Sequence, residues 1–572
     1  MKADLTRNSL SLLKHFSLVL NQQGRVQLDA DWNEQGGLLL HVMRQTAADG
    51  FGSAAASPQN GGFTAVPLQL GANTVPNDFG LTPGTYYVDG ILCELNGTPV
   101  PVTATDATGV TATVASWTVD AMPFTVNQYV RMWNDSANPG RQPPAPLPTT
   151  NMAPLPISQI KQAGYTNLTL TLDSLPAGLA TSSPPWNFVQ RITSYLTQPD
   201  LPNPPDLSKL LAAPNTSGLI YLDVWERLIT SIEDDYIREV ALNGPDTCAR
   251  VRVVWQAKVL PNLTACITPG QLTETLQPWT RGYLRARVSP AQISTDPCTI
   301  SPTSQYRGAE NQLYRVEIHT GNIDINGNPA GGTPSFKWSR ENGSVVFPVV
   351  KVAPSSNTTS VTLGNLGRDD RFGLEVGDYV ELQNDVTVLN NLVGNLLQVQ
   401  SIDPASLTVT LVGTTAAVDT TPSLHPLLRR WDHRSGDPTQ GGETVLPDGA
   451  LPIPTTTAQW IDLEDGVQVR FEVLSNITMT YRSGDYWLIP ARVATGNVIW
   501  PTETVTDSSG NTTTNPVAKP PDGITHHYAP LAVLTLTSGV PSVSPCPPPA
   551  PAAKGAATPA RTQARAAARG SK

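Results

Sequence analysis

Two stretches far apart in the chain carry nearly the same text, and this repeat constrains the fold more than any other feature. Residues 126–135 read VNQYVRMWND and residues 376–385 read VGDYVELQND, with Val, Tyr, Val, Asn and Asp in the same register. Each is followed by a strand-like phrase, LTLTL at 168–172 and LTVTL at 407–411. Two copies of one β-type unit predict two small β-barrels. The alternative is that short strands of this kind recur by chance. The first copy carries a proline-rich insertion, 139–156, which predicts an exposed extended loop.

Turn-forming residues divide the rest of the chain into short strands. Proline (53) and glycine (44) are frequent among the 572 residues, and only 15% of the residues are charged. This composition is typical of turn-rich β-proteins. Residues 84–102 predict a hairpin at Asp89-Gly90 with a second turn at Asn96-Gly97, and residues 313–350 predict another at Asn342-Gly343. The predicted fold class is mainly β and multi-domain, with small β-barrel or sandwich modules and a short N-terminal helical segment.

Shifts in composition set the expected domain boundaries. In chain order these are an N-terminal arm and helix (1–60), a β-hairpin region (61–104), barrel copy 1 (105–180), a central β-region (181–356), barrel copy 2 (357–415), a C-terminal β-region (416–545) and a disordered basic Pro/Ala-rich tail (546–572). The tail has five basic residues and no acidic one, so its expected role is either contact with an acidic neighbour or anionic surface, or solubilisation.

The stretch 19–35, VLNQQGRVQLDADWNEQ, is polar and unusually specific. Alternation over 26–30 predicts a short half-buried strand. Asp31 then stands where a helix N-cap is expected, and apolar residues at helical spacing continue that helix to about Ala48, before a Gly/Ser/Ala/Pro linker at 49–60. We interpret this stretch as a docking element, with a self-packed N-terminal cap as the alternative. The predicted docking residues are Arg25, Asp29, Asp31, Trp32, Asn33 and Glu34.

Charge and cysteine content limit the partners and the cellular compartment that the sequence predicts. The formal net charge of −10 gives no electrostatic support for nucleic-acid binding. No apolar run approaches the roughly 20 residues that span a bilayer, and charges interrupt the N-terminus, so membrane insertion and a secretory signal are not predicted. Synthesis in the cytoplasm is expected. The five cysteines form no CxxC pair, which predicts no disulfide framework; Cys248–Cys266 is the single candidate pair.

Six phrases together resemble a known group of proteins. They are KHFSLVLNQQGRVQLDADWNEQ (14–35), ENQLYRVEIH (310–319), FKWSRENGSVVFPV (336–349), LEDGVQVRFE (463–472), GDYWLIPAR (484–492) and HHYAPLA (526–532). This set resembles an uncharacterised bacterial family associated with gene clusters of phage-tail-like, extracellular contractile injection systems. The resemblance implies a structural part of a contractile particle, in its baseplate, cage, spike or fibre region. It implies no activity and no catalytic residue.

Structural roles explain the candidate metal and catalytic residues more simply than chemistry does. The adjacent His526 and His527 point to opposite faces of a strand, which suits one metal ion poorly. Residues 322–328 alternate oxygen donors before a glycine, but Pro334 stands where an EF-hand loop needs its glutamate. Paired carboxylates for glycoside hydrolysis occur at Asp223/Glu226, Glu233-Asp234-Asp235, Asp369-Asp370 and Glu464-Asp465, and such pairs in turns are usually solvated. No catalytic, cofactor-binding or metal-binding residue is predicted.

Aromatic residues beside arginines are the better lead for binding, because aromatic faces with Arg suit sugar or protein surfaces. The predicted surface-binding residues are Trp431, Arg434, Tyr486 and Trp487. The leading hypothesis is a non-enzymatic structural subunit whose partners are other copies of itself and neighbouring tail or baseplate proteins. The alternative is a tail fibre that binds a cell-surface glycan or receptor, and it requires Trp431, Tyr486 and Trp487 in one exposed groove. A polysaccharide-degrading tailspike is the third hypothesis.

Overall fold

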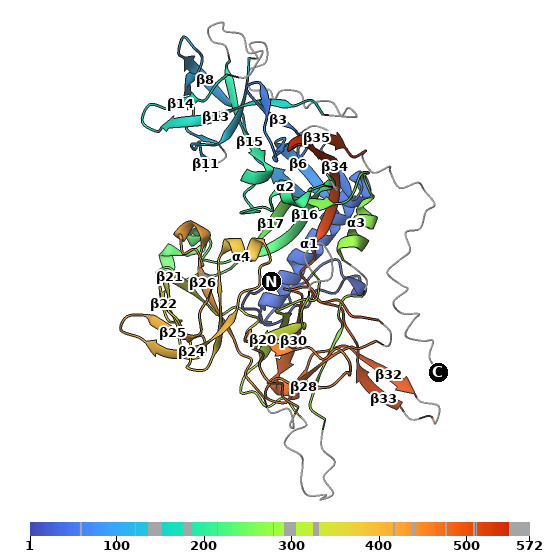
Figure 1. Cartoon of the computed structure of the whole chain (residues 1–572). Coiled ribbons are helices and arrows are strands. Elements are labelled where there is room, and N and C mark those ends of the chain that lie inside the picture. The colour runs from blue at the N-terminus through green and yellow to red at the C-terminus, as the bar shows by residue number, and fades with distance from the viewer. Residues whose placement is uncertain are drawn as a thin grey trace, which may run out of the picture.

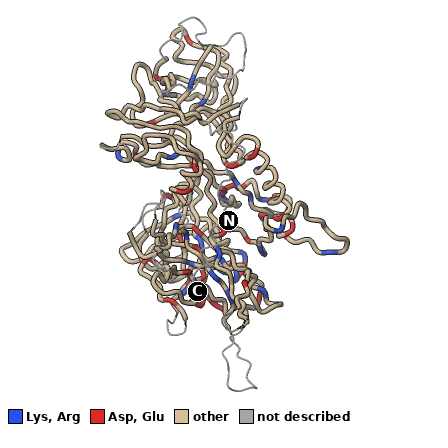
Figure 2. The backbone as a smooth tube through the Cα atoms, turned by 90° about the vertical axis from the view of Figure 1, so that its right-hand side faces the viewer, with Lys and Arg blue, Asp and Glu red and all other residues tan. Residues whose placement is uncertain are grey.

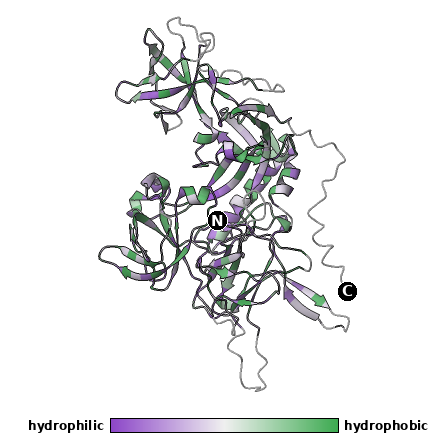
Figure 3. Ribbon diagram, in the orientation of Figure 1, coloured by the Kyte–Doolittle hydropathy of each residue, from purple (hydrophilic) through white to green (hydrophobic). Residues whose placement is uncertain are grey.

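The structure of the chain is a computed structural model. It describes residues 1–57, 60–119, 122–134, 152–175, 186–213, 216–277, 280–290, 305–323, 331–415, 418–436, 441–474, 477–506, 510 and 512–547. The described residues form a mainly β protein with several sheets and one long helix near the N-terminus (Figure 1). Apolar residues gather in the strands of the barrels and the central sheet, whereas the connecting loops are more polar (Figure 3).

Two six-stranded barrels confirm the predicted repeat. The first consists of β8 (Val100–Thr105), β9 (Thr111–Val114), β12 (Tyr129–Trp133), β13 (Leu155–Gly164), β14 (Thr169–Leu172) and β15 (Phe188–Ser194). The second consists of β21 (Val346–Pro354), β22 (Thr358–Leu363), β23 (Tyr379–Gln383), β24 (Leu396–Asp403), β25 (Thr408–Val412) and β26 (Leu427–Trp431). In both, the ring runs through the first, second, fifth, fourth, third and sixth strands and closes on the first. A closed ring leaves no open sheet edge.

Local details of the two barrels also agree. Tyr129 and Tyr379 each open the third strand. Leu168 and Leu407 each adopt the left-handed conformation, with φ of 51° and 52°, at the turn before the fifth strand. The carbonyl of each accepts a hydrogen bond from the last residue of the second strand. The repeat is therefore one of backbone geometry as well as of sequence.

The barrels extend beyond the predicted boundaries of 105–180 and 357–415. The first and sixth strands lie outside those limits in both copies, because they pair across the whole length of the unit and share no recognisable text. Most of the proline-rich insertion 139–156 lies outside the described residues, and its end enters β13.

A central four-stranded sheet joins distant parts of the chain. Its order is β17 (Arg250–Pro261), β16 (Ser217–Ile229), β34 (His527–Thr537) and β35 (Val540–Pro545). It shares a core with β1 (Ala54–Ala56), β6 (Gly84–Val88) and β7 (Ile91–Leu95), and with the short strands β2 (Ala65–Val66), β3 (Leu68–Leu70) and β5 (Gly80–Leu81). Strand β4 (Asn73–Thr74) pairs with β3. Helix α2 (Leu207–Leu210) adds to this core, and α3 (Pro269–Leu276) packs on β34.

A third β-region lies beside the second barrel. Its main sheet orders β27 (Leu451–Pro452), β20 (Ser335–Ser339), β19 (Gln312–Ile318), β30 (Tyr486–Arg492) and β31 (Asn497–Val498). A second layer has β18 (Leu284–Val288), β29 (Val467–Phe471) and β28 (Ile461–Asp462), and the hairpin of β32 (Thr502–Thr506) and β33 (Thr512–Pro516) projects from it. The predicted hairpin at Asn342-Gly343 is wrong. Both residues take the left-handed conformation of a tight turn, but the turn leads from β20 to β21, which belong to different sheets.

The hairpin at Asp89-Gly90 is confirmed and packs against the N-terminal helix. Strands β6 and β7 pair across it, and both turn residues have positive φ, as a type I′ turn requires. A Cβ on Gly90 would lie 1.9 Å from the backbone oxygen of Arg44, so only glycine allows this approach. The second predicted turn, Asn96-Gly97, joins no hairpin, because β8 leaves to pair within the first barrel.

Helix α1 (Asp29–Phe51) begins and ends differently from the prediction. Residues 26–28 form no strand, and Leu28, not Asp31, is the N-cap. Asp31 lies in the first turn, where its carboxylate accepts a hydrogen bond from the backbone of Leu28 at 3.4 Å. The expected linker 49–60 instead holds the end of the helix and strand β1.

A disulfide joins Cys266, which precedes α3, to Cys546, which follows β35. The prediction of no disulfide and the candidate pair Cys248–Cys266 are both wrong, and Cys248 is free and exposed. The sequence separation of 280 residues hid the true pair. Cys546 belongs to the folded body rather than to the tail. The basic residues of the tail lie outside the described residues.

Candidate functional site

The N-terminal arm, residues 1–28, lies along the body and against helix α1 through a few polar contacts. The Thr6 hydroxyl and backbone amide both donate to the Asp29 carboxylate, at 2.5 and 2.9 Å. The amide of Val19 donates to Gln35 at 2.8 Å. Between these contacts the arm has only one 3-10 turn, Leu12–Lys14. The Ser9 hydroxyl also donates to the carbonyl of Ala30 at 3.2 Å, so the arm is tied to the first turns of α1 at three points and carries little structure of its own.

The arm and α1 expose an unusual amount of apolar surface. On α1, Trp32, Leu39 and Met43 are 64%, 56% and 67% exposed. Their spacing of seven and four residues places them on one helix face. On the arm, Leu13 and Val26 are 90% and 85% exposed. We call these five residues, together with Phe16, Leu18, Leu20, Leu40 and Val42, the arm–helix surface. Contiguous apolar surface of this kind usually marks an interaction site.

The opposite side of α1 holds the helix to the body. Ala30 and Leu38 are buried. The guanidinium of Arg44 makes two hydrogen bonds to the Glu226 carboxylate of β16, at 2.6 and 3.2 Å. The helix therefore has one fixed side and one free apolar side.

The structure brings the predicted docking residues together at the start of α1. Asp29 and Asp31 hold the arm and the helix N-terminus, so both have an internal role. Arg25, Trp32 and Asn33 are exposed and Glu34 is half-buried. Trp32 does not seat the helix on its own chain, which contradicts the self-packed reading of this residue.

The predicted surface-binding residues do not form a surface. Trp431 and Trp487 are fully buried and Tyr486 is 8% exposed, so they cannot line an exposed groove. Arg434 is 60% exposed and pairs with Asp378 at 3.3 Å. Aromatic residues beside charges suggested a surface in the sequence, but here the charges are paired with one another beneath the rings. The groove required by the glycan-binding hypothesis is therefore missing.

The acidic pairs are explained by ion pairing. Asp223 contacts Lys258 at 2.7 Å and His526 at 2.6 Å. Burial raises the pKa of Asp223, but its interactions with His526 and Lys258 outweigh burial and hold the pKa well below its usual range. Two other acids of these pairs also contact an arginine: Glu233 contacts Arg227, and Glu464 contacts Arg340. For Glu464 burial prevails and raises its pKa. A carboxylate held as Asp223 is held is a poor candidate for hydrolytic catalysis.

The histidines and the calcium-like loop form no metal site in the described part of the chain. His526 faces Asp223, whereas His527 faces Asp89 at 2.8 Å, so the two point to different partners. No group of three or more possible ligands gathers among the described residues. Residues 324–328 of the calcium-like loop lie outside them.

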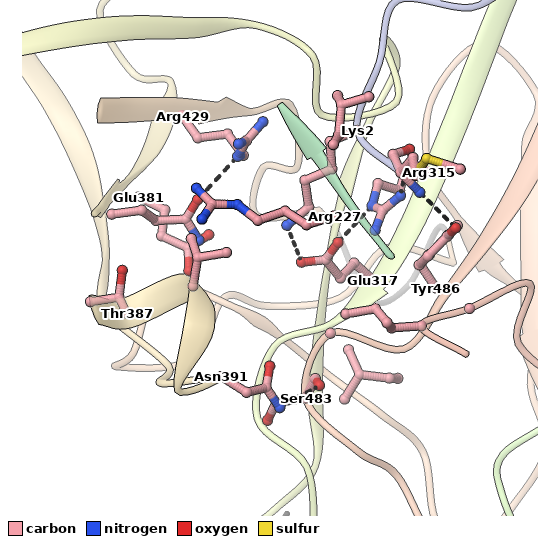
Figure 4. A pocket seen from close by; sticks show the side chains of 18 of the residues that line it. Lys2, Arg227, Arg315, Glu317, Glu381, Thr387, Asn391, Arg429, Ser483 and Tyr486 are labelled. Carbon is pink, nitrogen blue, oxygen red and sulfur yellow. Dashed lines mark hydrogen bonds and ion pairs between the residues drawn. The ribbon is translucent and has the colours of Figure 1, made fainter. Parts of the chain in front are cut away.

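A cavity of about 270 Å³ lies where the second barrel, the central sheet and the third β-region meet (Figure 4). The start of the arm enters it. The amine of Met1 donates to the Tyr486 hydroxyl at 2.7 Å, and the side-chain amide of Asn342 donates to the carbonyls of Met1 and Ala3. Charged residues of both signs crowd this part of the molecule, in contrast to the first barrel (Figure 2).

Buried ion pairs line the inner wall of the cavity. Glu317 contacts Lys2 at 2.9 Å and Arg315 at 2.6 Å, and Glu381 contacts Lys337 at 2.6 Å. Burial raises the pKa of each carboxyl, but the adjacent cations prevail: the pKa of Glu381 falls to about 2, and that of Glu317 lies well below its usual range. Arg315 and Glu317 in β19 and Lys337 in β20 alternate with apolar residues. In the sequence this pattern resembles an exposed strand face, so it gave no signal of a buried cluster.

We expect stability to fall steeply in acid because of this cluster. Both carboxyls have folded-state pKa values below the unfolded value near 4.5, so their contribution is complete above about pH 5. It is lost as the pH falls from about 4.5 towards 2, where the folded state must take up their protons. Urea unfolding at pH 7, 4, 3 and 2.5 measures this. An unfolding midpoint that stays flat over that range would contradict the assignment.

Comparison with known proteins assigns the chain to a family through its sequence alone. No described helix is long and apolar enough to cross a bilayer. Comparison with curated proteins and with solved structures finds no match. A profile described as "Family of unknown function (DUF6519)" matches residues 1–123, 208–278 and 263–547, which together are more than half of the chain. The protein therefore belongs to this family, DUF6519.

Proposed function

We propose that the protein is a structural subunit that assembles into a larger particle through its arm–helix surface. The observation that carries the proposal is the exposed apolar stripe of Trp32, Leu39 and Met43 on a helix whose other side is fixed to the body. Leaving such a stripe in water is unfavourable, at roughly 25 cal/mol per Å² of apolar surface. Burial against a partner removes that penalty.

A neighbouring copy of this chain is the proposed occupant. The arm displays Leu13, Leu20 and Val26 to solvent and has almost no secondary structure. Long irregular segments of this kind are usually covered by a partner or carry a function. Arm and helix stripe are both apolar and both unpartnered, so the arm of one copy matches the stripe of the next. Repetition around a particle multiplies such contacts.

The kind of particle is inferred from the sequence resemblance. The six phrases shared with the family of contractile injection gene clusters favour a phage-tail-like contractile particle, with this chain in its baseplate, cage, spike or fibre region. Most of these phrases lie in buried strands or in the arm. They are therefore consistent with a shared framework, and the particle assignment needs its own test.

Trp32→Ala tests the assembly role. We expect a folded protein that fails to form oligomers and no longer co-purifies with particles, because the substitution removes the largest side chain of the stripe. Asp31 is left intact since it serves the helix start. Light scattering measures the mass, and sedimentation of particles from producing cells measures incorporation.

Tyr236→Ala is the matched control, because Tyr236 is 95% exposed and lies outside the arm–helix surface. It should assemble like the unmodified protein. If Trp32→Ala also assembles normally, the arm–helix surface is not the interface. If the chain forms oligomers that never associate with sheath and tube proteins, the assembly role stands and the contractile particle is rejected.

A further inference from the structure

The cavity beneath the arm carries an excess of positive charge. Several of its charged residues form closed pairs: Arg227 with Asp385 at 2.5 Å, Glu226 with Arg44 at 2.6 Å, and Asp522 with Lys519 at 3.1 Å. The remaining charged side chains are four cations, Lys2, Arg315, Lys337 and Arg429, and three carboxylates, Glu233, Glu317 and Glu381, so one cation is in excess. Glu233 lies 3.5 Å from Arg227. Buried charges are normally paired, because removing them from water is costly.

Arg429 is the cation without a counterion. Its side chain is 9% exposed, and no carboxylate lies within ion-pair distance of it among the described residues. Its Nε donates to Gln383 at 3.1 Å and its Nη1 donates to the carbonyl of Gly343. Both acceptors are neutral, and Nη2 is left for a further acceptor. Burial lowers the pKa of Arg429 more than the surrounding carboxylates of Glu317, Glu381 and Glu233 raise it.

Two further donors lie at the same turn. Ser344 follows Gly343 directly and lines the cavity, and its buried hydroxyl has no hydrogen-bond partner in the structure. The side chain of Lys2 passes over Gly343, since a Cβ there would lie 3.6 Å from the Lys2 Cδ. Burial lowers the pKa of Lys2 to about 7, against the attraction of Glu317. An anion at this corner would therefore meet a guanidinium, a hydroxyl and an ammonium group.

The rest of the cavity suits a small organic group. Trp225, Val388 and Ile524 contribute apolar wall. Leu392 and Val393 line the cavity and are 55% and 44% exposed, so the cavity reaches solvent at their rim. A guanidinium fork with further donors matches the oxygens of a phosphate group.

We propose that this cavity is a binding site for a phosphate group, whose charge is balanced by Arg429 and Lys2 and whose oxygens accept hydrogen bonds from Arg429 and Ser344. The volume of about 270 Å³ leaves room for a small substituent, so the phosphate is free or belongs to a small phosphomonoester. The site is independent of the arm–helix surface, because the face of α1 that carries Trp32 does not line it.

Calorimetric titration of the full chain tests the site. Inorganic phosphate and glycerol 3-phosphate are titrated in chloride buffers of equal ionic strength at pH 6.5. We expect saturable binding of phosphate. Tighter binding of the ester assigns the remainder of the cavity to its substituent, whereas equal or weaker binding assigns the site to the free anion.

Arg429→Gln should weaken the binding at least tenfold, as expected for the loss of a charge-assisted contact. Arg434→Gln is the matched control: it removes an arginine near the end of the same strand but outside the cavity, and should change the affinity less than about twofold.

Ser344→Ala keeps the proposal testable if Arg429→Gln fails to fold, since it deletes only a hydroxyl that has no partner. It should weaken phosphate binding severalfold and leave the melting temperature without phosphate unchanged. The absence of saturable binding, or equal affinity in the unmodified protein and in both cavity variants, would overturn the site.

Discussion

Glu317→Gln is expected to lower the free energy of unfolding by about 3–5 kcal/mol, the range for breaking a buried ion pair from one side. Glu317 is 3% exposed and contacts both Lys2 and Arg315, with Lys337 at 3.7 Å. The substitution keeps the shape of the side chain and removes its charge, which leaves three cations around a neutral amide. Urea unfolding at pH 7 measures the change.

Glu226→Gln provides the comparison. It lines the same cavity and also pairs with an arginine, but both partners are 27% exposed. Water screens this pair, so its loss should cost less than about 1 kcal/mol. Similar losses for the two variants would show that burial of the Glu317 cluster contributes nothing.

Removal of the Cys266–Cys546 disulfide should have the second large effect. The bond closes a loop with a sequence separation of 280 residues. In the chain-entropy description, releasing a loop of this size from the unfolded state costs up to about 5 kcal/mol. We expect Cys266→Ser to lose several kcal/mol in urea unfolding, with β35 and the start of α3 losing hydrogen-exchange protection first.

Cys248→Ser is the matched control, because Cys248 is exposed and free. It should leave the stability unchanged both with and without reductant. A reducing agent should reproduce the effect of Cys266→Ser in the unmodified protein and have no effect on the Cys266→Ser variant. Equal stability of oxidised and reduced protein would reject the bond as a stabilising element.

The sequence predicted those parts of the fold that depend on short segments of local sequence. The repeat was visible because the third and fifth strands of each barrel, with Tyr129 and Tyr379 in register, lie in short segments that changed little. The hairpin at Asp89-Gly90 was predicted because its turn needs positive φ at both residues. The barrel boundaries were missed because closure pairs β8 with β15 and β21 with β26, across most of each unit.

The cavity was invisible for a different reason. In LYRVEI the charged residues Arg315 and Glu317 alternate with apolar ones, which normally indicates a solvent-facing side of a strand. The structure covers that side with the second barrel and with Lys2 from the start of the chain. The same cover buries Tyr486, which the sequence suggested for a surface. Of the predicted binding surfaces, only the arm–helix surface lies where the sequence placed it. Its Trp32 is exposed and stands in the polar stretch 19–35.

The place where Met1 and Lys2 lie has a consequence for synthesis on the ribosome. The first residues of the chain contact Glu317, Asn342 and Tyr486, so their seat is complete only when most of the chain has been made. Each barrel, in contrast, is closed by strands of a single continuous unit and has what it needs to fold as it emerges. The arm therefore stays unseated until late, and its apolar residues join a fixed helix only in finished subunits. The geometry thus delays the seating of the arm until Tyr486 has been synthesised.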